Sequence, residues 1–201
     1  LLIKEYDMND LIPFIHFGLT SNDINSFANA LLLKEYITSK YIPSLINIIK
    51  NLKEFNKYDE LSFPTYTHGQ LATPSTFYKE ILVFIDRIVN ECSYLTKYQF
   101  SAKFGGAIGN CNVHYFIYND IKWVEEFNKF LEEHEIIRQN FTTQIEHYDN
   151  ISNLFDCLKR INNILIDLCQ DMWLYISKDL IQQHVIDKEI GSSTMPHKVN
   201  P

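Results

Sequence analysis

The longest helical pattern in this 201-residue chain is the stretch from Asn150 to His184, NISNLFDCLKRINNILIDLCQDMWLYISKDLIQQH. Its apolar side chains recur at alternating spacings of three and four residues, which is typical of one face of an α-helix. The members of this stripe are Ile151, Leu154, Leu158, Ile161, Leu165, Leu168, Met172 and Tyr175. Because a stripe of this length has to pack lengthwise against another helix, the sequence predicts a bundle of long helices.

Other segments show the same periodicity, namely residues 22–58, residues 73–95 and residues 120–133. We expect the first of them to bend or break near Pro43, because a proline ring removes a backbone donor and clashes with the preceding turn. The second should begin with Thr73 as its N-cap and Pro74 as its first helical residue. The chain has only six glycines and few alternating β-branched residues, so we predict an all-α fold class.

The composition limits the class of protein. With 46% hydrophobic residues and no internal repeat, low-complexity segment or linker, residues 1–201 are expected to form a single long-helix bundle domain. The net charge of −7 argues against binding to nucleic acid, because proteins that bind the phosphate backbone need an excess of cations. No apolar run approaches the roughly 20 residues that cross a bilayer, so we expect no membrane insertion.

The cysteines give an expectation about the compartment. They form no Cys-x-x-Cys pair, and we expect reduced, mostly buried thiols in a cytoplasmic protein. The residues concerned are Cys92, Cys111, Cys157 and Cys169. No two histidines are spaced with a carboxylate as a metal site requires, so we expect no metal.

Polar or glycine-rich connections separate the predicted helices, at residues 16–23, 63–73, 104–112 and from 190 onward. The last contains Gly-Ser-Ser-Thr-Met-Pro-His-Lys-Val-Asn-Pro, residues 191–201. A stretch with a glycine, two prolines and this many polar groups is neither helix nor strand. Loops that gather titratable groups commonly meet a ligand, although a solvated surface turn is the alternative.

Residues 191–201 resemble the signature of the fumarase, aspartase and argininosuccinate lyase superfamily, whose members eliminate fumarate from substituted succinates. Within that signature, the histidine that follows Met-Pro, His197, is similar to the residue that the adenylosuccinate lyase family has at this position. Two further blocks agree in order, HFGLTSND at residues 16–23 and THGQLATPST at residues 67–76. A fourth block, TTQIE at residues 142–146, narrows the resemblance to the bacterial-type branch of that family.

The resemblance implies the central helical domain of a longer protein. The sequence begins without methionine and stops inside the signature, so we expect a fragment whose neighbouring domains are missing. The expected reactions release fumarate from adenylosuccinate, giving AMP, and from succinyl-aminoimidazole-carboxamide ribotide in purine synthesis. The family also implies homotetramers with shared active sites, and it implies no organic cofactor.

The implied elimination needs a base, a clamp for the anionic intermediate and an acid for the departing nitrogen. The resemblance puts the base on the first of two adjacent serines, Ser192, and their adjacency leaves Ser193 as the alternative. A serine alkoxide needs backbone donors, a cation or exclusion of water, and Lys198 is a nearby cation. The resemblance assigns the acid to His68, and an imidazole with an unperturbed pKa of about 6.5 can donate and recover a proton near neutrality.

The resemblance also implies a set of substrate-binding residues, which share polar or cationic side chains. They are His16, Thr20, Ser21, Thr67, Gln144, Lys198 and Asn200. Thr20 and Ser21 have an alternative as simple helix N-caps, and His16 is either a phosphate or substrate contact or a partner that orients His68. His114, His134 and His184 are expected to be ordinary surface or core residues.

One departure from the family pattern concerns His147. Relatives have a Pro-His-Asp run after Gln-Ile-Glu, whereas this chain has His147-Tyr148-Asp149, so we leave His147 out of the site. Two alternative functions remain open at this point. One is another fumarate-releasing lyase, acting on argininosuccinate, aspartate or malate, and the other is an inactive structural protein, like the lens crystallins of the superfamily.

Overall fold

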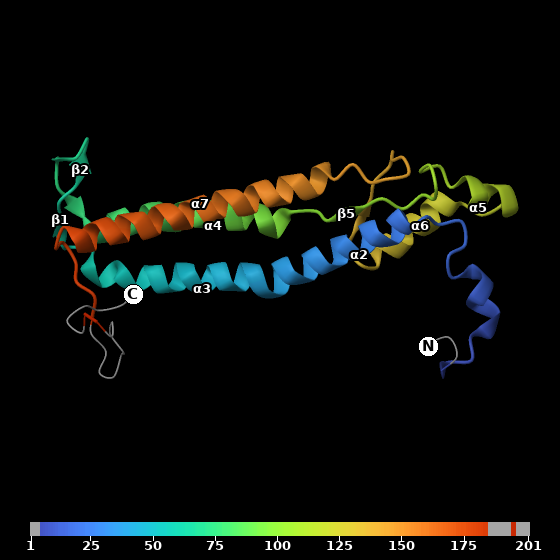
Figure 1. Cartoon of the computed structure of the whole chain (residues 1–201), viewed down its shortest axis with the longest axis horizontal. Helices are drawn as coiled ribbons and strands as arrows, with labels where there is room; N and C mark the ends of the chain where they lie inside the picture. The colour runs from blue at the N-terminus through green and yellow to red at the C-terminus, as the bar shows by residue number, and fades with distance from the viewer. Residues whose placement is uncertain (1–4, 185–193, 196–201) are drawn as a thin grey trace.

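The computed structural model describes residues 5–184 and 194–195, and long helices dominate it. One helical rod consists of α2 (Ser21–Tyr36), the π-helical turn η2 (Ile37–Tyr41) and α3 (Ile42–Lys53). Two more rods are α4 (Phe77–Lys97) and α7 (Asp149–Ser177), and α4 packs against both α3 and α7 (Figure 1). The predicted all-α class and the long-helix bundle are therefore confirmed.

Short elements occupy the two ends of the bundle. The helical ones are η1 (Asn9–Phe14), η3 (Glu54–Tyr58), α5 (Asn112–Ile117) and α6 (Trp123–Glu132). The strands, of two residues each, are β1 (Ser62–Phe63), β2 (Tyr66–Thr67), β3 (Gln70–Leu71), β4 (Ser75–Thr76), β5 (Ser101–Ala102) and β6 (Ile137–Arg138). β1 pairs with β4 and β2 with β3 in antiparallel fashion, whereas β5 and β6 are parallel.

The stripe predicted on the last long helix forms the core. Leu154, Ile161 and Leu168 of α7 are buried, and the buried face of α4 opposite them includes Ile81 and Ile88. The interior also contains Cys92, Cys111 and Cys157 as free thiols, whereas Cys169 is exposed. The predominance of buried cysteines agrees with the prediction.

Pro43 interrupts the first rod, as the sequence predicts. It lies at the start of α3, and immediately before it the Ile42 N–H donates to the carbonyl of Ile37, five residues back. The proline has no N–H and its ring would crowd the carbonyl of the preceding turn, so the chain widens into a π-helical turn instead of breaking.

The predicted start of α4 is wrong by three residues. The helix begins at Phe77, and its N-cap is Thr76, whose Oγ1 accepts a hydrogen bond of 3.3 Å from the Lys79 N–H. Thr73 lies in the loop before it, where its carbonyl accepts a hydrogen bond from the Thr65 hydroxyl. Strand pairing of β4 with β1 holds residues 75–76 extended, so Thr73 and Pro74 cannot start the helix.

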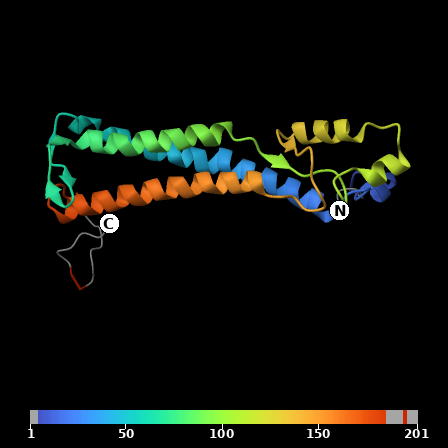
Figure 2. The ribbon, with the colours of Figure 1, turned by 90° about the horizontal axis from the view of Figure 1, so that it is seen from above.

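The bundle is elongated, and its ends differ (Figures 1 and 2). At one end, β1 to β4 lie where α4 begins and α7 finishes, and the rings of Phe63 and Tyr175 are in edge contact at 4.9 Å. At the other end, η1, α5, α6 and the β5–β6 pair surround the start of α2. Within residues 5–184, no helix combines the length and apolar character needed to cross a membrane.

Candidate functional site

His68 and Thr67 lie at the end of the bundle that holds the β2–β3 hairpin. Thr67 pairs with Gln70, so His68 and Gly69 form a two-residue loop, with φ values of +51° and +72°. Positive φ at both loop positions is the geometry of a type I′ turn, which histidine tolerates better than most residues and glycine adopts freely. The turn holds the His68 imidazole in solvent, away from the core.

His16, Thr20, Ser21 and Gln144 lie at the opposite end. Thr20 is the N-cap of α2 and is half-buried, so the helix-capping alternative applies to it. The side chains of His16, Ser21 and Gln144 are exposed. The structure therefore gathers these residues around the first turn of α2 and separates them from His68.

A buried ion pair anchors the first turn of α2. The Lys103 ammonium donates a hydrogen bond of 2.6 Å to the Asp23 carboxylate, and both side chains have no exposed surface. The same carboxylate accepts hydrogen bonds from the backbone N–H groups of Thr20 at 2.8 Å, Gly105 at 2.9 Å and Gly106 at 3.1 Å. Since a buried carboxylate with several donors is well stabilised, this cluster fixes the segment 103–106 against α2.

A second connection joins the Thr142–Glu146 block to the same turn. The Glu146 N–H donates a hydrogen bond of 2.9 Å to Asn22 Oδ1, and Asn22 Nδ2 donates one of 3.3 Å to the Tyr148 hydroxyl. Asn22 directly follows Ser21, and Glu146 lies two residues after Gln144. The blocks at 16–23 and 142–146, far apart in the sequence, are thus neighbours in the fold.

The loop 103–110 is the part of this site to which the sequence alone assigned no role. It contacts both blocks, because Gly106 approaches the carbonyl of Gly18 and Gly109 approaches the carbonyl of Thr142. The glycine content of this loop is the sequence feature that could have indicated its role in the site. The ion pair of Lys103 with Asp23 has no such local sequence feature, because the two residues are 80 positions apart.

Replacing Gly109 by Ala should destabilise the fold by about 1 to 3 kcal/mol more than replacing Gly69 by Ala. Both glycines have positive φ, +84° and +72°, so both variants share the backbone strain. Only at Gly109 would the new Cβ lie 2.1 Å from the carbonyl oxygen of Thr142, whereas Gly69 has nothing within 4 Å. Urea unfolding of the two variants measures the difference, and equal midpoints would contradict this packing.

His114 is a buried residue that lies next to Gly18 and Gly106. Its Nε2 lies 3.0 Å from the carbonyl oxygen of Phe17, and its Nδ1 has no hydrogen-bond partner among the described residues. The ring packs edge-on against Phe17 and Phe127. His134 and His184 are exposed, so the expectation of ordinary core and surface histidines agrees with the burial of these residues.

Acidification should destabilise the chain through His114. Burial lowers the pKa of His114 below its usual value, so below about pH 6.5 this imidazole binds a proton more readily in the unfolded chain than in the folded one. The stability that neutral His114 contributes is present above that pH and is lost as the pH falls below it. The free energy of unfolding, measured between pH 8 and about pH 5, should decline less steeply in His114→Phe than in the wild type. A matched control at the exposed His134, His134→Gln, should keep the wild-type slope, and an unchanged slope in His114→Phe would contradict the assignment.

The two groups of site residues cannot meet within one copy of the chain. His68 lies beside the end of α7, and Gln144 lies just before its start. α7 has 29 residues, which at about 1.5 Å per residue corresponds to about 43 Å. A site that uses both groups therefore needs more than one copy.

Ser192, Ser193, Lys198 and Asn200 lie outside the described residues. Among residues 5–184, no group of three or more histidine, cysteine, aspartate or glutamate side chains is arranged to hold a metal ion.

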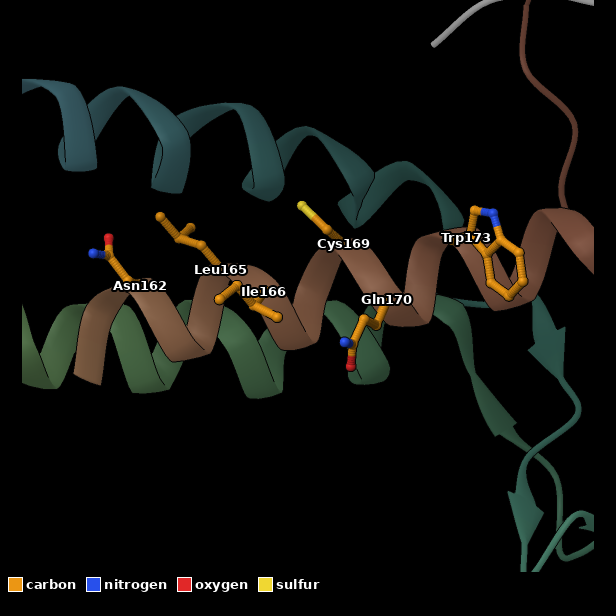
Figure 3. Close-up of a pocket in the computed structure, with 6 residues that line it drawn as sticks. All are labelled: Asn162, Leu165, Ile166, Cys169, Gln170 and Trp173. Carbon is orange, nitrogen blue, oxygen red and sulfur yellow. The ribbon is translucent and has the colours of Figure 1, made fainter. Parts of the chain in front are cut away.

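An open groove of about 600 Å³ runs along α7. Figure 3 shows its lining, which comprises Asn162, Leu165, Ile166, Cys169, Gln170 and Trp173. Leu165 and Cys169 project toward the side on which α3 runs (Figure 3). Trp173 is 70% exposed and Ile166 is 52% exposed, so this face presents large apolar side chains to solvent. Of the predicted site residues within 5–184, none lines the groove.

Comparison with known proteins gives consistent matches. Residues 4–201 match the model of a lyase family. Adenylosuccinate lyase of Dictyostelium discoideum is 48% identical over 94% of the chain. The adenylosuccinate lyases of Legionella pneumophila strain Corby and Escherichia coli K12 are each 39% identical, over 96% and 97% of the chain. The chain spans 41% of the first relative's length and 43% of the other two.

Proposed function

The chain belongs to the lyase family of the fumarase/aspartase superfamily, and on this basis we propose that it is part of an adenylosuccinate lyase. The proposed reactions are the β-eliminations of fumarate from adenylosuccinate, giving AMP, and from succinyl-aminoimidazole-carboxamide ribotide. The observation that supports this most strongly is that relatives from an amoeba and from bacteria, at 39% to 48% identity, have the same name.

In the proposed mechanism, one of the adjacent serines Ser192 and Ser193 removes the C–H proton next to a substrate carboxylate. His68 protonates the nitrogen that leaves. Its exposed position at the tip of the β2–β3 turn supports this role, because the imidazole is free to enter a pocket of another subunit. Lys198 and Asn200 hold a carboxylate when the signature segment meets the substrate.

At the opposite end of the bundle, Ser21 and Gln144 bind the succinyl part of the substrate, and Thr20 and His16 complete this half of the site. Hydroxyl and amide groups suit this role, since they donate hydrogen bonds to carboxylate oxygens. Thr67 acts beside His68. No metal or organic cofactor has a step in this chemistry.

The proposed assembly is a homotetramer with shared active sites. Two observations support it. The predicted site residues lie at opposite ends of α7, about 43 Å apart by its helical length. The outer face of α7 also exposes Phe155, Ile166 and Trp173, and apolar surface of this kind favours burial against another helix. We propose the cytoplasm as the location, in line with the free cysteines.

The full-length enzyme provides the direct test. Incubation with adenylosuccinate should change the ultraviolet absorbance as AMP and fumarate form. Parallel incubations with argininosuccinate, aspartate and malate test the alternative lyases. If the enzyme turns over one of these compounds but not adenylosuccinate, the proposed reaction is wrong and the corresponding lyase activity takes its place. Absence of turnover on all four compounds would favour an inactive structural protein.

A further inference from the structure

Asn22 has an unusual set of contacts for a residue in the first turn of a helix. It is 8% exposed, and both ends of its amide are used. Oδ1 accepts from the Glu146 N–H at 2.9 Å, and Nδ2 donates to the Tyr148 hydroxyl at 3.3 Å. A single side chain of α2 therefore holds the segment that follows Gln144.

The partner segment is fixed from its other side as well. The Glu146 side chain is 3% exposed, and its Oε1 accepts a hydrogen bond of 2.7 Å from Gln139 Nε2. Gln139 Nε2 also donates to Ser101 Oγ at 3.1 Å, in the β5 strand. The Asn22 amide therefore supplies the hydrogen bonds that connect Glu146 and Tyr148 directly to α2.

We propose that Asn22 is a positioning residue, which sets the place of Gln144 relative to Thr20 and Ser21 without touching the substrate itself. The inference deepens the proposed function and rests on it, since it assumes that these side chains share one dicarboxylate. Ser21 is next to Asn22 in the sequence, and Gln144 is two residues before Glu146. Loss of the Asn22–Glu146 hydrogen bond therefore moves Gln144 relative to Ser21.

The physical reason is the geometric demand of carboxylate binding. Hydrogen-bond donors bind a carboxylate well only at about 2.7 to 3.0 Å, and a displacement of about 1 Å of a positioning group can cost up to 100-fold in rate. If two segments of the chain bind the same part of the substrate, the distance between the two segments has to be fixed. The buried side chain of Asn22 fixes this distance.

The test compares Asn22→Ala with Ser26→Ala in the full-length enzyme. Ser26 lies one turn further along α2, is 2% exposed and accepts a hydrogen bond of 2.9 Å from the Lys103 N–H. Within residues 5–184, the Ser26 side chain makes no hydrogen bond to residues 142–148. Both variants lose a buried hydrogen bond on the same helix. Ser26→Ala keeps the Asp23–Lys103 ion pair that fixes residues 103–106 against α2. Only Asn22→Ala releases Glu146, so only it should raise the KM for adenylosuccinate, by about tenfold or more, with a smaller change in kcat.

Tyr148→Phe is a second matched control. It removes the hydroxyl that accepts a hydrogen bond from Asn22 Nδ2. The hydrogen bond from the Glu146 N–H to Asn22 Oδ1 remains, so KM should stay near the wild-type value. Amide hydrogen exchange of residues 142–148 should increase in Asn22→Ala and remain at the wild-type rate in Ser26→Ala. Should Asn22→Ala fail to fold, Asn22→Ser keeps a polar group with too short a reach for both contacts and is judged by the same criteria.

Equal KM values in Asn22→Ala, Ser26→Ala and the wild type would overturn the inference. Succinate binding, measured by calorimetry, separates this outcome from failure of the proposed function. If the wild type binds succinate but does not turn over adenylosuccinate, the proposed function fails, and weaker succinate binding in Asn22→Ala alone would still support the positioning role. If Asn22→Ala binds succinate as tightly as the wild type, the positioning role is wrong whatever the reaction.

Discussion

Replacement of His68 by Asn should lower kcat of the full-length enzyme by about 10² to 10⁴-fold, the usual contribution of a general acid. This corresponds to roughly 3 to 5 kcal/mol in the activation barrier. Asparagine is a better replacement than alanine here, because His68 has a φ of +51°, and asparagine adopts this left-handed conformation more readily. The hairpin should therefore persist while the imidazole is removed.

Steady-state kinetics on adenylosuccinate and the circular dichroism spectrum measure the two parts of this prediction. The control is His184→Asn, which removes an exposed histidine outside the predicted site and should leave kcat unchanged. A His68→Asn enzyme with wild-type kcat would remove His68 from the proton-transfer step.

Replacement of Lys103 by Ala should lower the free energy of unfolding by about 3 to 5 kcal/mol, the usual cost of breaking a fully buried ion pair. The Asp23 carboxylate would stay buried with backbone donors but without a cation. Because the same cluster holds the loop 103–106 against α2, activity should also fall in this variant. Urea denaturation of wild type and variant measures the change.

The matched control is Lys122→Ala, which removes an exposed ion pair to Glu125 and should leave the unfolding midpoint unchanged. The double variant Lys103→Met, Asp23→Asn should regain part of the loss, because it removes both charges at once. A Lys103→Ala variant no less stable than Lys122→Ala would mean that the pair is not buried as described.

The sequence predicted the long helices well, because their evidence is local. The stripe from Ile151 to Tyr175 lies within α7, and the interruption near Pro43 follows from the chemistry of proline. The start of α4 was predicted at Thr73 instead of Thr76, since the pairing of β4 with β1 depends on residues more than ten positions earlier. Local capping signals do not contain that information.

The same distinction applies to the site. Motif resemblance identified the blocks that contain Thr20, His68 and Gln144. It did not predict that His68 lies at the opposite end of the bundle from Thr20 and Gln144. Neither the Asp23–Lys103 pair nor the Asn22–Glu146 hydrogen bond is visible in the sequence, because each joins residues 80 or more positions apart. Contacts of this kind depend on how the rods pack, which periodicity alone does not determine.

We propose that each active site combines residues from opposite ends of different copies of this chain. Subunit complementation tests it most directly, by mixing full-length His68→Asn enzyme with full-length Gln144→Ala enzyme under conditions that allow subunit exchange. Each parent should be nearly inactive, and the mixture should regain activity, because some sites then combine an intact His68 from one copy with an intact Gln144 from another. A mixture that exchanges subunits and stays as inactive as its parents would contradict the claim.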